Sequence, residues 1–332
     1  MIYLPFSSSS TEETILNVLT DELGLKPYQV HQAQKLMHFG FPPIATTKTL
    51  SYLLGVSDGI IYTMSKFLEN YYRLYSIPKK SGGERQIESP RIILKVVQRW
   101  LYLNILIKVK LSDNVNGFVP GKNIFSNAKP HINSKNLMVI DIQNFFPSIP
   151  KRNVFNIFRN AGFTVRVSYV LAGLCTFEGR LPQGAPTSPM LANIAFAPVD
   201  TRLRDLAESW GCIYSRYADD LAFSGDRHFT KQDIFAISEL LENNGFHVNN
   251  VKSRITGKGS RQVVAGLVIN KYGLPTREKR RRWRALFHDA SENPKEIKET
   301  TAQLRGIASF VKQYNPKLAS SYFDIANKTA GK

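Results

Sequence analysis

The stretch CIYSRYADDLAFSG, residues 212–225, places two carboxylates side by side between apolar and aromatic segments. The alternating pattern on both sides predicts two strands joined by a tight turn at Ala218–Asp220. Adjacent carboxylates repel each other, and aspartate is a poor strand former. Asp219 and Asp220 therefore either form a solvated turn or face a bound cation that makes their repulsion useful.

The charge of the chain is the most informative part of its composition. The 332 residues include 44 Lys and Arg against 26 Asp and Glu, a net charge of +18. Residues 271–332 hold fourteen basic and six acidic residues, whereas residues 1–60 are slightly acidic. A field of this size favours a polyanion, and nucleic acid is the first candidate, although a merely soluble basic protein would share the composition.

The cysteines and the apolar runs bear on where the protein works. Cys175 and Cys212 form no C-x-x-C pair, so we expect neither a disulfide nor a zinc site. The stretch MIYLPFSSSSTEE lacks the basic and apolar regions of a secretory signal, and no apolar run reaches the length of a membrane-spanning helix. These features predict a cytoplasmic protein without a membrane partner.

The order of elements predicts an α+β fold. Helical patterns precede a β-hairpin that turns at Gly82–Gly83, and an amphipathic helix follows over 91–109. A Gly/Pro-rich loop leads into a helix at about 189–208. Farther on, the pattern predicts one strand over QVVAGLVIN (262–270), paired with LPT. The last sixty residues are predicted to be helical and are basic. Strands and helices interleave without strict βαβ order, which indicates a core sheet carrying helices.

A third acid joins the aspartate pair. Asp141 lies in the apolar strand NLMVIDIQNFF, far from Asp219 and Asp220 in sequence, so only the fold could unite the three. Grouped carboxylates suit Mg²⁺, which takes one or two of them and completes its shell with water and substrate phosphates. Two such ions about 4 Å apart would stabilise the attacking and leaving oxygens of a phosphoryl transfer.

Several motifs in order resemble those of reverse transcriptases. VIDIQNFFPSI, LPQGAPTSP and YADD resemble the palm, IPKKSGGERQI the fingers hairpin and LRGIASFVKQYNP the thumb, across about residues 70–310. The resemblance implies a right-hand polymerase fold with an antiparallel palm sheet. Its parts would be a helical N-terminal extension (1–67), fingers (68–130), a palm containing part of the fingers (131–274) and a basic helical thumb (275–332).

The resemblance also implies the catalytic residues of an RNA-directed DNA polymerase. Asp141 and Asp219 would hold two Mg²⁺ ions, for which Mn²⁺ could substitute. Asp220 would lie beside them, and the carbonyl of Ile142 would complete a site.

The same resemblance implies a set of residues that bind the incoming dNTP. Phe146 occupies the steric-gate position that rejects a ribose 2′-OH, unless it is a core aromatic, and Gln183 would line the nucleotide. Lys79 and Arg85 would clamp the triphosphate, because Arg suits bidentate phosphate contacts; a solvated basic hairpin is the alternative. Lys252 would act as general acid toward pyrophosphate.

Length and one motif resemble bacterial retron reverse transcriptases in particular. About sixty residues follow the palm, so we expect no domain beyond a thumb, unlike group II intron and viral enzymes. NAKPH matches the retron Asn-Ala-x-x-His motif through Asn127 and His131, although a buried histidine is the alternative. The second retron mark, Val-Thr-Gly, has Ala265 in place of Thr. The primer-gripping hairpin would include Gly266 and Leu267.

A retron enzyme implies a dedicated partner RNA. The family primes from the 2′-OH of a guanosine in a structured non-coding RNA and copies part of it into branched, RNA-linked DNA. An effector protein encoded nearby usually completes a phage-defence system. The basic segment REKRRRWRALF would recognise an RNA stem, unless it is only a solvated helix face. Its candidate RNA-binding residues are Arg280, Arg281, Arg282, Trp283 and Arg284. Asn127 and His131 would also bind the RNA.

Three other interpretations stay open. Ala265 leaves room for a bacterial antiphage reverse transcriptase outside the retrons. An RNA-binding scaffold with a silent polymerase fold is a different class, against which the intact acids and Gln183 argue. An RNA-dependent RNA polymerase would have to tolerate the 2′-OH, which Phe146 disfavours.

Overall fold

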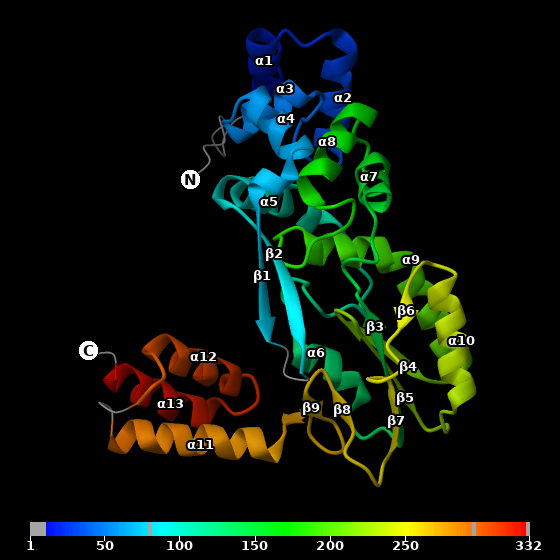
Figure 1. The fold of residues 1–332 in the computed structure, drawn as a ribbon, viewed down its shortest axis with the longest axis vertical. Helices are drawn as coiled ribbons and strands as arrows, with labels where there is room; N and C mark the ends of the chain where they lie inside the picture. Colours follow the sequence, from blue (N-terminus) through cyan, green and yellow to red (C-terminus); the bar gives the residue numbers. More distant parts are fainter. Residues whose placement is uncertain (1–10, 79–81, 294–296, 330–332) are drawn as a thin grey trace.

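A computed structural model describes residues 11–78, 82–293 and 297–329. Its first section is helical, as predicted (Figure 1). The helices are α1 (Glu12–Leu23), α2 (Pro27–His38), α3 (Thr47–Leu54) and α4 (Asp58–Lys66). Three of the four begin after a hydroxyl residue that accepts a backbone N–H of the first turn: Thr11, Thr46 and Ser57.

A long hairpin follows these helices. Strands β1 (Tyr72–Pro78) and β2 (Glu84–Pro90) pair antiparallel along their whole length, which confirms the predicted hairpin. Helix α5 (Ile92–Asn104) comes next and is shorter than the predicted 91–109. The prediction was wrong at this end because Ile105 leaves the helical conformation and a 3₁₀ turn takes over at Leu106–Lys108.

The central sheet is antiparallel and has five strands. They are β3 (Asn136–Gln143), β4 (Ile213–Tyr217), β5 (Asp220–Gly225), β6 (His247–Val248) and β7 (Arg254–Gly257). The order is β4-β5-β3-β6, with β7 also pairing with β3. The sheet therefore places β3 at its centre and the predicted 212–225 hairpin along one side.

Both faces of β3 are covered. Met138 and Ile140 belong to the main apolar core, whereas Leu137 and Val139 pack in a second cluster on the opposite face. This two-sided burial explains why β3 reads as a continuous apolar run rather than an alternating one. The helices of this part of the chain are α6 (Ile124–Ala128), α7 (Lys151–Asn160), α8 (Val165–Cys175), α9 (Ser188–Ser209) and α10 (Lys231–Glu242).

A small three-stranded sheet connects the central sheet to the C-terminal helices. Its strands are β8 (Val263–Val264), β9 (Leu267–Val268) and β10 (Leu274–Pro275). The prediction of one strand over 262–270 was wrong. Ala265 and Gly266 both adopt positive φ, 46° and 80°, and so turn the chain between β8 and β9.

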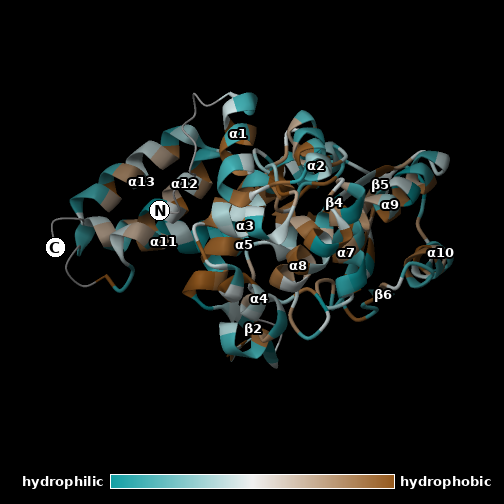
Figure 2. Ribbon diagram, turned by 90° about the horizontal axis from the view of Figure 1, so that it is seen from above, coloured by the Kyte–Doolittle hydropathy of each residue, from teal (hydrophilic) through white to brown (hydrophobic). Residues whose placement is uncertain are grey.

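The chain ends in three amphipathic helices, α11 (Arg277–Glu292), α12 (Thr301–Lys312) and α13 (Pro316–Lys328). Polar and apolar residues mix along each of them (Figure 2), and their apolar residues form a separate core. Phe310 of α12 packs on Phe125 of α6, with 5.4 Å between ring centroids. In the described part of the chain, no helix has the length and apolarity needed to cross a membrane.

Candidate active site

The fold brings the three predicted acids together. Asp141 on β3 lies directly opposite Asp220 on β5 in the antiparallel register. The backbone N–H of Ile142 donates to the carbonyl of Asp219 at 2.9 Å. Directly opposed residues in a sheet project to the same face, so the strand pairing itself assembles a carboxylate site.

Burial and mutual repulsion disfavour negative charge at this site. Burial is the main cause that raises the pKa of Asp220 to about 6, and the carboxylates of Asp219 and Asp141 raise it further. Burial also raises the pKa of Asp219, while Lys252 and Arg85 act in the opposite direction. The electrostatics of the site therefore favour a bound positive charge.

Lys252 supplies one such charge. Its Nζ lies 3.0 Å and 3.2 Å from the two carboxylate oxygens of Asp141. The Asp141 side chain is buried and that of Lys252 is half exposed. The lysine thus reaches the site from the solvent side, between β6 and β7.

The donor set fits a hard divalent cation that arrives with its substrate. Over the described ranges, no three His, Cys, Asp or Glu side chains form a ready-made metal cage. Mg²⁺ seldom uses such cages, because it binds through one or two carboxylates plus water and substrate phosphates. Asp141, Asp219 and Asp220 offer carboxylates that suit this mode of binding.

A buried network, which the sequence patterns did not predict, fixes the turn that carries Asp219. The side chain of Arg216 is fully buried and forms a two-point ion pair with Asp200 of α9, at 2.7 Å and 2.8 Å. It also donates to Asn193 at 2.8 Å and to the carbonyl of Ala218 at 3.1 Å. The sequence did contain one indication of this network. Arg216 lies within an apolar strand pattern, and a buried charge requires a partner.

The backbone of residues 114–117 supports the same turn from the other side. Arg216 exchanges backbone hydrogen bonds with Asn114 and Asn116, at 2.8 Å and 2.9 Å. A Cβ atom on Gly117 would overlap the backbone nitrogen of Ala218. Ala218 itself has a φ of 58°. The turn is thus held tightly between two segments, and only glycine fits at position 117.

Three further predicted nucleotide-binding residues lie in the described part of the chain. Phe146 is half buried, and its ring lies 6.1 Å from that of Phe118 and 5.7 Å from that of Phe145. Arg85 is exposed on β2, and its charge reaches Asp219. Gln183 is half buried in the loop before α9. Lys79 lies outside the described residues.

The predicted retron motif lies inside the protein. Asn127 and His131 are almost fully buried. The two ring nitrogens of His131 each lie 2.7 Å from a serine Oγ, Ser215 on β4 and Ser224 on β5. The prediction that Asn127 and His131 touch RNA directly is therefore wrong, because other side chains cover both. Their position behind the two strands supports a structural role.

The predicted primer-gripping pair lies at the β8–β9 turn. Gly266 is exposed with open space around its Cα, and Leu267 is buried. The positive φ of Gly266 is the reason for a glycine at this position. The prediction had given another reason, a close approach of the backbone to the primer. Ala265, at the place of the retron Thr, forms the other half of the turn.

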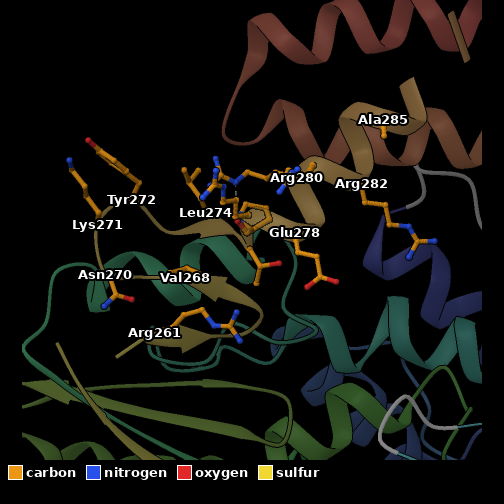
Figure 3. Close-up of a pocket in the computed structure, with 14 residues that line it drawn as sticks. Arg261, Val268, Asn270, Lys271, Tyr272, Leu274, Glu278, Arg280, Arg282 and Ala285 are labelled. Atoms are coloured by element: carbon orange, nitrogen blue, oxygen red, sulfur yellow. Dashed lines mark hydrogen bonds between the residues drawn. The ribbon is translucent and has the colours of Figure 1, made fainter. Parts of the chain in front are cut away.

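A basic groove lies where the small sheet meets α11. Arg261, Lys271 and Arg282 come from different segments around it, and its volume is about 950 Å³ (Figure 3). Of the predicted RNA-binding residues, Arg281, Arg282 and Arg284 are exposed and Arg280 is half buried. Trp283 is different, since its ring packs 5.3 Å from that of Phe310. Trp283 is half buried, and its contact with RNA stays a prediction.

Comparisons with known proteins agree with this geometry. The family model described as reverse transcriptase (RNA-dependent DNA polymerase) matches residues 77–283. The chain is 33% identical over 308 residues to the retron Mx65 reverse transcriptase of Myxococcus xanthus, covering 86% of this chain and 72% of that protein. It is 35% identical over 260 residues to the retron Ec86 reverse transcriptase of Escherichia coli, covering 76% and 81%.

The matched region contains the strands β3 and β5, which carry the opposed carboxylates. The similarity to the two retron enzymes extends beyond that region, over most of this chain and of each relative. The chain therefore belongs to the retron-type reverse transcriptases, and it is an RNA-directed DNA polymerase.

Proposed function

We propose that the enzyme copies part of a dedicated structured non-coding RNA into single-stranded DNA that stays joined to RNA through a 2′-5′ branch. The observation that carries this proposal is the cross-strand pairing of Asp141 with Asp220, beside Asp219, in a chain similar to named retron enzymes. An effector protein encoded nearby and a role in phage defence complete the proposal.

The right-hand arrangement is part of the proposal. The antiparallel sheet with its acids suits a palm at 131–274, and the β1–β2 hairpin suits fingers at 68–130. Helices α11–α13 suit a thumb at 275–332, and α1–α4 suit the helical extension proposed for 1–67.

The acids would hold two Mg²⁺ ions, for which Mn²⁺ could substitute, with the Ile142 carbonyl as a further ligand. Such ions stabilise charge on the attacking and leaving oxygens of a phosphoryl transfer. In the reaction, a guanosine 2′-oxygen, and later each DNA 3′-oxygen, bonds to the α-phosphorus of a dNTP as pyrophosphate leaves. Lys252, which lies half exposed beside Asp141, would protonate the leaving group.

The other predicted site residues would hold the nucleotide, the primer end and the RNA. Arg85, together with Lys79, would hold the triphosphate, Gln183 would line the base and sugar, and Phe146 would exclude a 2′-OH. Gly266 and Leu267 would place the primer end. The basic groove and the exposed arginines of α11 suit RNA phosphates, which supply a large share of nucleic-acid affinity.

The test is to purify the wild type and the Asp219→Ala/Asp220→Ala variant and to sequence the nucleic acid that co-purifies with each. We expect branched RNA–DNA with the wild type. The variant should carry the same RNA without DNA and should incorporate no dNTP, while its thermal unfolding shows that it is folded. Full incorporation by the variant would disprove the catalytic assignment.

A second outcome would favour a defence enzyme outside the retrons. Free, unbranched DNA, or the absence of any structured RNA, would point to it. The specific observation in its favour is Ala265 at the position of the retron Thr.

A further inference from the structure

Glu88 on β2 has a buried carboxylate whose partners all lie in one loop. Its two oxygens accept hydrogen bonds from both terminal nitrogens of Arg180, at 2.6 Å and 2.9 Å. One of these oxygens also accepts the backbone N–H of Gln183 at 3.1 Å. The side chain is 6% exposed, so water cannot replace these donors.

The same residue also holds the other backbone group of Gln183. The N–H of Glu88 donates to the carbonyl of Gln183 at 2.8 Å. Both hydrogen-bonding groups of the Gln183 backbone are thus bonded to a single residue. The next residue, Gly184, packs so closely that a Cβ atom there would lie 2.7 Å from the Glu88 carbonyl oxygen. The loop therefore rests directly on β2.

Strand β2 also carries Arg85, whose charge reaches Asp219. One strand thus connects the proposed triphosphate-binding residue to the loop that presents Gln183. A shift of Glu88 against the loop would change the distance between these two parts of the nucleotide site. Errors of about 1 Å in such positioning are enough to impair an enzyme strongly.

We propose that Glu88 is a positioning residue for the incoming nucleotide and acts by fixing the backbone of Gln183. The carboxylate oxygen that accepts the Gln183 N–H controls nucleotide affinity. The negative charge of Glu88 stabilises the fold through its ion pair with Arg180. The inference rests on the proposed contact between Gln183 and the nucleotide.

Two substitutions separate these roles. Glu88→Gln keeps an acceptor for the Gln183 N–H but removes the ion pair, so it should lower the unfolding temperature and leave KM for dNTP within about threefold. Glu88→Leu removes the acceptor and should raise KM about tenfold, with kcat at saturating dNTP changed less. Steady-state kinetics per active site, counted by titration, give both values.

Glu178→Gln is the matched control, because Glu178 also lies near Arg180, at 3.3 Å, but is exposed and does not bond Gln183. It should leave KM unchanged. Equal KM values for the wild type, Glu88→Gln and Glu88→Leu would overturn the inference, and so would an equal rise in both variants.

Gln183→Ala distinguishes this failure from failure of the proposed nucleotide contact. If Gln183→Ala raises KM and Glu88→Leu does not, the positioning role alone is wrong. If Gln183→Ala leaves KM unchanged, the nucleotide contact itself is wrong.

Discussion

A neutral histidine, His131, connects the two strands of the β4–β5 hairpin inside the protein. Burial lowers the pKa of His131 to about 4, and both of its ring nitrogens face serine hydroxyls. At neutral pH the ring carries one proton, donates through one nitrogen and accepts through the other. Protonation would place a charge in the core without a carboxylate to receive it.

This arrangement predicts a pH-dependent stability. An ordinary histidine titrates near 6.5 and folded His131 near 4, so the unfolded state binds more protons between these values. The contribution of neutral His131 to the free energy of unfolding is therefore complete above pH 6.5. As the pH falls toward 4, the protein loses about 3 kcal/mol of this stability. Urea unfolding of the wild type and of His131→Gln should show a steeper loss in the wild type. Parallel curves would contradict the prediction.

The position of Phe146 leads to a prediction about discrimination between dNTPs and rNTPs. Phe146→Ala should admit rNTPs with a modest loss of dNTP use, because the ring would no longer occupy the space needed by a 2′-OH. The ratio of kcat/KM for dNTP to that for rNTP measures this effect. Phe235→Ala, which removes an exposed ring on α10, is the control and should leave the ratio unchanged. Unchanged discrimination in Phe146→Ala would assign that ring to packing alone.

At the scale of elements, the β4–β5 turn that carries Asp219 depends on segments that are distant in sequence. The β4–β5 turn is held by α9 through Arg216 and Asp200, and by residues 114–117 through the backbone. Neither segment carries any of the three acids Asp141, Asp219 and Asp220. The position of Asp219 is therefore a property of three packed elements rather than of the hairpin alone.

Gly117 gives a direct test of this dependence. Gly117→Ala should force the 114–117 segment and the turn apart, costing about 1–3 kcal/mol of stability and lowering dNTP incorporation more than tenfold. Primer-extension rates and thermal unfolding measure the two effects. Gly59→Ala is the control, because a Cβ atom there meets only Ser57 Oγ, at 3.9 Å. Wild-type activity in Gly117→Ala would show that the turn tolerates displacement.

Local patterns predicted most of the elements but not their long-range partners. Alternation around Asp219 and the apolar run at Asp141 predicted the strands, because those patterns reflect burial of each residue itself. The pairing of Arg216 with Asp200 and of Glu88 with Gln183 depends on the folded path of the chain. The turn at Ala265 was missed because its flanking valines favour a strand, and a single glycine gave too weak a signal against them.

At the scale of the whole molecule, the net charge is +18, and residues 271–332 contribute fourteen basic residues against six acidic ones. The basic groove is lined by Arg261 and by arginines of α11, among them Arg281 and Arg282. Counterion release makes binding to such a surface strongly salt-dependent.

Replacing Arg280, Arg281 and Arg282 by Gln should weaken RNA binding and lower the salt slope by about one for each phosphate that is no longer neutralised. The rate at which the variant extends a generic primed template should fall less than its affinity for the RNA. Binding isotherms at several salt concentrations measure the slope. The control removes the same charge elsewhere, at exposed Arg152, Arg166 and Lys231. An equal loss of affinity in both triple variants would show that only total charge matters.

The central position of β3 also has a consequence for biosynthesis. A ribosome makes β3 before β4, β5, β6 and β7, and its pairing is complete only after residue 257 has emerged. At ordinary translation rates this interval lasts on the order of ten seconds. During it, the most apolar strand of the nascent chain has two free edges, which is the condition that promotes aggregation. Folding yield therefore depends on how the segment from β3 to β7 is protected while it is being synthesised.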